Sequence, residues 1–190
     1  MRRLFLLSIL LISVYSYSRT DGVKYARAHA HNINHKCGSH TSCSPCSYWG
    51  SEHCNYKDNG GDCANFVSQC LVLGGGYPKL VGSDNCRGYP CGFEEIAAKR
   101  LGICLHGKGW KRTCGYLQKP PSNIKAGDVL IYHKGNCDSW SAHAVYITQG
   151  GASPKITCHS NEKLDVDYNY MKNSMPYYEW LHYNDKIYSK

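Results

Sequence analysis

Residues 61–71 read Gly61-Asp62-Cys63-Ala64-Asn65-Phe66-Val67-Ser68-Gln69-Cys70-Leu71, and their spacing predicts an amphipathic helix that begins at a cysteine. Asp62 is a good cap for a helix start. One inward face collects the apolar residues that follow at helical intervals: Phe66, Val67, Cys70 and Leu71. Free backbone N–H groups and the helix dipole would favour a negative charge on Cys63. The stretch therefore predicts a nucleophilic thiol, with a buried structural cysteine as an equally weighted alternative.

Helices are expected before this stretch and strands after it. Residues 21–33 have a helical stripe of small apolar side chains, and the central helix should run from Cys63 to Leu73, ending at Gly74-Gly75-Gly76. Three later segments alternate as strands do: 128–133, 142–148 and 155–159. The stretch from Asp165 onward is rich in Tyr and Trp, and core packing is favoured over a sugar-stacking surface. The pattern predicts an α+β domain with a small antiparallel sheet.

A hairpin between two of the predicted strands would bring two histidines together. If the strands at 142–148 and 155–159 pair symmetrically about the turn at residues 150–152, His143 lies opposite His159. Cross-strand partners have Cβ atoms about 4.5–5.5 Å apart on one face of the sheet, so one imidazole could orient the other. A bulge or a slip of one residue would break this register.

The N-terminus has the features of an export signal. Two arginines precede an apolar run from Leu4 to Val14 that is too short to span a bilayer, and small residues at Val14-Tyr15-Ser16 or Ser16-Tyr17-Ser18 offer cleavage sites. We expect residues 1–18 to be a signal peptide and residues 19–190 to be a single domain, secreted or lumenal (phagosomal or lysosomal). Cleavage would lower the formal charge from +8 to +6.

Twelve cysteines in an exported chain indicate disulfides before zinc. If Cys63 is a free nucleophile, parity requires a second unpaired cysteine, and Cys70 on the buried face of the same helix is the choice. The other ten would form five bridges of undetermined pairing. Most of these cysteines lie in two segments, 37–54 and 86–114, which are expected to be loops cross-linked by disulfides. A zinc site in the first segment is the weaker alternative. No metal or cofactor is expected.

A second feature is a run of positive charge. Residues 96–126 contain no Asp or Glu but seven basic residues: Lys99, Arg100, Lys108, Lys111, Arg112, Lys119 and Lys125. Such a segment would attract an anionic partner, and an ordinary solvated face has equal weight.

Four ordered blocks carry a resemblance to a known family. They are the block at 62–71, Ala126-Gly127-Asp128-Val129-Leu130-Ile131-Tyr132, Ala142-His143-Ala144-Val145-Tyr146-Ile147-Thr148, and Cys158-His159-Ser160-Asn161. Together they resemble the putative amidase domain related to the NlpC-type and CHAP-type cell-wall hydrolases of the papain-like superfamily. The resemblance implies a papain-like fold in which the cysteine helix packs on a small antiparallel sheet, here with disulfide-rich loop insertions.

The resemblance also implies a site and an activity. Cys63 would be the nucleophile, His143 the general base and His159 the third polar group. The backbone N–H of Cys63 is a natural oxyanion donor, and Tyr56 or Trp49 would supply a second. The expected function is a secreted, antibacterial amidase or endopeptidase acting on peptide amides of bacterial peptidoglycan, as a monomer that binds no nucleic acid and inserts into no membrane. The alternatives are a general secreted or lysosomal-type cysteine protease and a non-enzymatic disulfide-rich module in which Cys63 is bridged.

Overall fold

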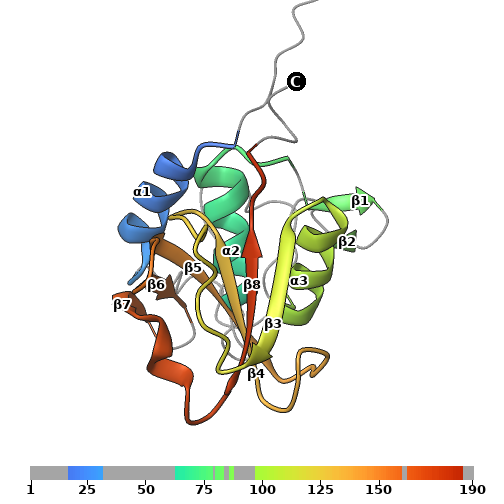
Figure 1. Ribbon diagram of the computed structural model, residues 1–190. Helices are drawn as coiled ribbons and strands as arrows, with labels where there is room; N and C mark the ends of the chain where they lie inside the picture. The colour runs from blue at the N-terminus through green and yellow to red at the C-terminus, as the bar shows by residue number, and fades with distance from the viewer. Residues whose placement is uncertain are drawn as a thin grey trace, which may run out of the picture.

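The computed structural model describes residues 17–31, 63–78, 80–83, 86–87, 97–159 and 162–185. These residues form an α+β fold built on a six-stranded antiparallel sheet with the strand order β3-β8-β4-β5-β6-β7 (Figure 1). The sheet strands are β3 (Lys111–Tyr116), β4 (Val129–His133), β5 (Ala142–Gln149), β6 (Lys155–Cys158), β7 (Lys163–Asp167) and β8 (Tyr177–His182). The helical elements are α1 (Arg19–His29), α2 (Cys63–Gln69), η2 (Cys70–Gly74), α3 (Ala98–Gly107) and η3 (Tyr168–Met171), and a two-stranded ladder joins β1 (Val81–Ser83) to β2 (Cys86–Arg87).

The helices α1, α2 and α3 pack on one face of the sheet. That face is apolar because alternate residues of β4 and β5, among them Ile131 and Ala144, point to it. The residues between them, such as Leu130 and Val145, form a second core on the other face. The ring of Tyr170 and its neighbours in η3 pack against this second core. The centre of the sheet is therefore buried on both sides.

The central helix begins at Cys63, as the sequence predicts. It is regular only to Gln69 and continues to Gly74 as a π-helical turn, which the backbone N–H of Gly75 closes on the carbonyl of Cys70. A Cβ atom on Gly74 would lie 2.4 Å from Cβ of Tyr25. Glycine at this position thus allows α1 to pack closely against the end of the central helix.

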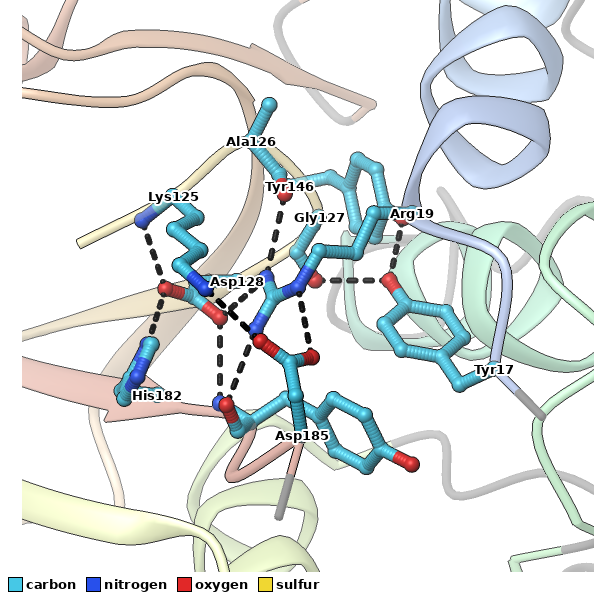
Figure 2. A network of polar contacts seen from close by, with 10 residues as sticks. Tyr17, Arg19, Lys125, Ala126, Gly127, Asp128, Tyr146, His182 and Asp185 are labelled. Atoms are coloured by element: carbon cyan, nitrogen blue, oxygen red, sulfur yellow. Dashed lines mark hydrogen bonds and ion pairs between the residues drawn. The ribbon is translucent and has the colours of Figure 1, made fainter. Parts of the chain in front are cut away.

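Asp128 ties both ends of the described chain to the sheet (Figure 2). Its buried carboxylate accepts from Nη1 of Arg19 at 2.6 Å, from Nδ1 of His182 at 2.7 Å and from the backbone N–H of Tyr183 at 3.0 Å. Arg19 also donates to the carbonyl oxygens of Ala126 and Tyr183. The start and the end of the domain are thereby held together at the residue that precedes β4.

Tyr17 and Ser18 also belong to the folded domain. The Tyr17 hydroxyl donates to the carbonyl of Gly127 at 2.6 Å and contacts the hydroxyl of Tyr146, and the ring is buried (Figure 2). Ser18 caps α1 by accepting from the backbone N–H of Asp21. The fold thus includes two residues that the sequence analysis assigned to the signal peptide.

The C-terminal aromatic stretch is a central strand, which confirms its expected role in the core. Tyr178 and Trp180 of β8 are fully buried. Cys114 of β3 and Cys137 form a disulfide across a Cα–Cα distance of 6.3 Å, and Cys104 is also disulfide-bonded. The predicted staples at 37–54 lie outside the described residues. Among those that are described, no helix has the length and apolar character needed to cross a membrane.

Candidate active site

Cys63 lies at the first residue of α2, and its thiol is not disulfide-bonded and is 6% exposed. Every residue of α2 is buried, because the helix is covered on the side facing the sheet and on the side facing its neighbours. The alternative in which Cys63 is bridged is wrong. A thiol outside any disulfide at a helix start retains the features expected of a nucleophile.

His143 is the second residue of β5 and pairs with Tyr132 of β4. Its ring is stacked at 6.3 Å on the ring of Tyr132 and meets the ring of Tyr170 edge-on at 6.3 Å. The side chain is 7% exposed, and its Nε2 atom has no hydrogen-bond partner among the described residues. Burial lowers the pKa of His143 to about 4, so the imidazole is neutral at neutral pH.

His159 follows β6 and is held by two contacts. Its Nε2 atom is 2.7 Å from the carbonyl oxygen of His29, and its ring stacks on Phe66 of α2 at 4.0 Å. A carbonyl only accepts hydrogen bonds, so Nε2 carries the proton. In the neutral ring, Nδ1 is therefore the acceptor. His159 thus has a defined tautomer and lies on the helix-bearing side of the sheet.

The predicted pairing of the two histidines is wrong by one residue. Tyr146 pairs with Thr157 and Ile147 with Ile156, and the register changes between Ile147 and Gln149. This irregularity adds a residue to one strand near the turn, which shifts every pair beyond it. His143 and His159 are therefore not direct cross-strand partners. The shift of one residue also places the two side chains on opposite faces of the sheet, with His143 beside Tyr132 and His159 beside Phe66 of α2.

Tyr170 and Cys158 connect the candidate nucleophile with the candidate base. The Tyr170 hydroxyl lies 3.3 Å from Sγ of Cys158, and its ring contacts His143. Burial raises the pKa of Cys158 to about 11; the hydrogen bond to Tyr170 opposes this rise, and the nearby thiol of Cys63 adds to it. Burial also raises the pKa of Tyr170, with further contributions from Cys158 and Cys63. Cys63, Cys158, Tyr170 and His143 thus surround one region at the same end of the sheet.

The sequence analysis missed Cys158 and Tyr170. Cys158 was counted among the bridged cysteines, yet it is free and buried, as is Cys70, whose free thiol is confirmed. The only available signal for Cys158 was its position next to His159. No feature of the sequence distinguishes Tyr170, as a site residue, from the other aromatic residues of its segment. The predicted oxyanion donors Tyr56 and Trp49 lie outside the described residues.

Chemically, this region offers thiol and imidazole groups. In the part of the chain that the structure describes, no group of three or more His, Cys, Asp or Glu side chains is placed to hold a metal ion. The polar groups that converge here are a free thiol, a neutral imidazole and a protonated phenol. Such groups suit nucleophilic attack on a carbonyl carbon with proton transfer.

Comparison with known proteins places the chain in a family. Residues 16–183, which include all the blocks named above, match the family model described as "Putative amidase domain". No curated protein and no solved structure matches the chain.

Proposed function

The chain belongs to the putative amidase domain family, and from this premise we propose that it hydrolyses amide bonds with Cys63 as the nucleophile. The family suggests the amide bond as the target. The observation that carries the cysteine mechanism is that Cys63, at the start of α2, stays out of any disulfide in a chain that forms disulfides elsewhere. Tyr170 links this thiol to the buried neutral imidazole of His143, because its ring contacts His143 and the Cys63 thiol contributes to its raised pKa.

We propose His143 as the general base. A base must be neutral before it accepts a proton, and burial keeps His143 neutral down to about pH 4. The described structure has no hydrogen bond between this imidazole and Cys63, and catalytic hydrogen bonds commonly tighten only when substrate is bound. The proposal therefore expects substrate to bring the thiol and Nε2 of His143 together.

His159 is proposed as the third polar group of the site. The carbonyl of His29 fixes its tautomer and Phe66 fixes its ring plane, so Nδ1 presents a lone pair in a constant direction. An acceptor held in this way, on the side of the sheet that bears α2, can receive a hydrogen bond from the thiol of Cys63. This differs from the cross-strand opposition that the sequence predicted, but it keeps the role of an orienting group.

The proposed reaction is acyl transfer to water. His143 takes the proton of the Cys63 thiol while the sulfur attacks the amide carbonyl carbon, and the carbonyl oxygen becomes an oxyanion near the backbone N–H of Cys63. The C–N bond then breaks as His143 returns the proton to the leaving amine. Water, deprotonated by His143, attacks the thioester and releases the carboxylic acid and the thiol.

We propose bacterial peptidoglycan as the substrate class. The protein would act on it in a secreted or lumenal compartment, and its fold would be papain-like. The ordered cysteine and histidine blocks support this proposal, as does a cysteine helix that packs on an antiparallel sheet. The formal charge of +6 that remains after signal cleavage also suits an acidic polymer. The Cys114–Cys137 disulfide is in keeping with an oxidising compartment.

The experiment is digestion of purified peptidoglycan with mass analysis of the released fragments. Wild-type protein should release peptides, either from the sugar or within the stem peptide, and Cys63→Ser should release none. Cys70→Ala is the matched control, because Cys70 is another free buried thiol on the same helical segment. Release by Cys63→Ser at the wild-type rate would show that the nucleophile is assigned wrongly.

A further inference from the structure

The loop of residues 134–141, between β4 and β5, leads directly into the candidate base and is tied down on several sides. Cys137 is bridged to Cys114 of β3, and its carbonyl oxygen accepts from Arg112 at 3.3 Å. Nδ1 of His133 is 3.2 Å from the carbonyl of Ser139. These contacts fix the backbone of the loop, so the side chains it exposes are held in place before any ligand binds.

Trp140 is the main side chain that this loop exposes. Its indole is 64% exposed and three residues before His143. Two cations from the first turn of α3 lie over the ring, with Nζ of Lys99 at 4.7 Å and the guanidinium carbon of Arg100 at 5.6 Å from the ring centroid. Figure 1 shows α3 beside β3, the strand to which the loop is bridged.

The two cations of this surface have no carboxylate partner in the part of the chain that the structure describes. Lys99 donates to the backbone carbonyl of Asp138, and neither Lys99 nor Arg100 is paired with a carboxylate among the described residues. Arg112 differs, because its Nε donates to the buried carboxylate of Glu179 at 2.6 Å. Most of the guanidinium donors of Arg100 are therefore available to an anionic ligand.

A groove adjoins these side chains. It is open, has a volume of about 320 Å³ and is lined by Arg112, Cys114, Cys137 and Asp138. Lys99 touches the backbone of Asp138, so the groove and the Trp140 ring form a continuous surface. That surface offers an aromatic face, two cations that pair with no described carboxylate, and a concave wall side by side.

We propose that Lys99, Arg100 and Trp140 form a substrate subsite that binds a carboxylate-bearing peptide of a peptidoglycan strand. The guanidinium of Arg100 matches a carboxylate in a bidentate geometry, and Lys99 adds a second charge. The indole packs against the apolar part of the same ligand, as aromatic anchors do at binding interfaces. The substrate class of this subsite rests on the proposed function. Trp140 is only three residues before His143, so one bound strand could contact the subsite and the candidate active site together.

The test measures binding separately from hydrolysis. Cys63→Ser protein is sedimented with insoluble peptidoglycan over a range of salt concentrations. The same measurement is made on two further variants of this protein, one that adds Lys99→Glu plus Arg100→Glu and one that adds Trp140→Ala. Lys24→Glu plus Lys172→Glu is the matched control, since it makes the same charge change on exposed residues of other elements. Melting temperatures check that each variant is folded.

Charge reversal at Lys99 and Arg100 should weaken binding at least about tenfold and flatten its salt dependence. Trp140→Ala should weaken binding while leaving the salt dependence intact. Peptidoglycan whose carboxylates have been amidated should bind wild-type and charge-reversed protein equally weakly. Unchanged binding in the Lys99 and Arg100 variant, or an equal loss in the control, would overturn the subsite. If the variants behave as expected but wild-type protein releases no fragments, the proposed reaction fails and the subsite stands.

Discussion

At the scale of single residues, the burial of His143 determines how the protein responds to acid. The folded state holds this imidazole neutral with a pKa of about 4, compared with 6.5 for an ordinary histidine. Between these two values the unfolded chain binds a proton that the folded chain does not. This difference stabilises the fold fully when the pH is above the pKa of the unfolded chain, and the stabilisation is lost as the pH falls towards the pKa of the folded state.

The prediction is that His143 makes the fold acid-sensitive. Lowering the pH from about 7 to about 4 should cost about 3 kcal/mol of unfolding free energy through this residue alone. Urea unfolding of wild-type protein and of His143→Gln at both pH values measures it, since the variant lacks the titrating group. The assignment of a depressed pKa is contradicted if both proteins lose the same free energy over that range.

The two histidines of the site should differ in their effect on catalysis. His143→Ala should lower the hydrolysis rate by roughly 10²–10⁴, the usual contribution of a general base. His159→Gln should be milder, because an amide still presents an acceptor near the position of Nδ1. The measurement is kcat on peptidoglycan fragments for both variants, with melting temperature as the control for folding. A larger loss at His159 would transfer the base role to it, since the carbonyl of His29 already fixes its tautomer.

At the scale of structural elements, Asp128 holds α1 and the end of β8 to the start of β4. Asp128→Asn should lower the unfolding free energy by about 3–5 kcal/mol, because it leaves a partly buried Arg19 without its buried charge partner. Asp185→Asn is the control: Asp185 also pairs with Arg19 but is 46% exposed, so its loss should cost less than about 1 kcal/mol. Equal effects of the two substitutions in urea unfolding would contradict the proposed role of burial.

The chain start makes a separate prediction about signal cleavage. Tyr17 packs its ring against Tyr183 at 5.0 Å and Tyr77 at 5.6 Å. Losing this buried ring should cost about 3–5 kcal/mol. Cleavage after Ser16, which the Val14-Tyr15-Ser16 site allows, is therefore expected, and N-terminal sequencing of exported protein should begin at Tyr17. A first residue of Arg19, with unchanged melting temperature, would contradict this.

The sequence predicted regular elements well where periodicity is strong. It predicted the helix start at Cys63 and the strands β4, β5 and β6 to within one residue at each end. It missed β3 and β8 as strands, because their residues alternate weakly or are aromatic on both faces. The register of β5 with β6 was wrong because the pair nearest the turn, Gln149 with Lys155, is not symmetric about residue 151, and neither this offset nor the irregularity that follows it has a signature in composition.

At the scale of the whole molecule, the sheet separates two cores and brings the candidate site to one end. Cys63 belongs to the core under the helices, whereas Tyr132 and Cys158 belong to the core on the other face. Among the described residues, three cysteines outside any disulfide are buried in this arrangement: Cys63, Cys70 and Cys158. The sequence could indicate the reactive one from its helix position, but the proximity of Cys158 depends on the tertiary fold.

The central claim is that Cys63, and neither of the other two free thiols, forms the covalent intermediate. The most direct measurement is to react native protein with p-nitrophenyl acetate, quench it with acid and locate the acetyl group by peptide mass mapping. The account predicts an acid-stable thioester on Cys63, none on Cys70 or Cys158, and no adduct after Cys63→Ser. Acetylation of Cys158 in place of Cys63, or turnover with no thioester on Cys63, would contradict it.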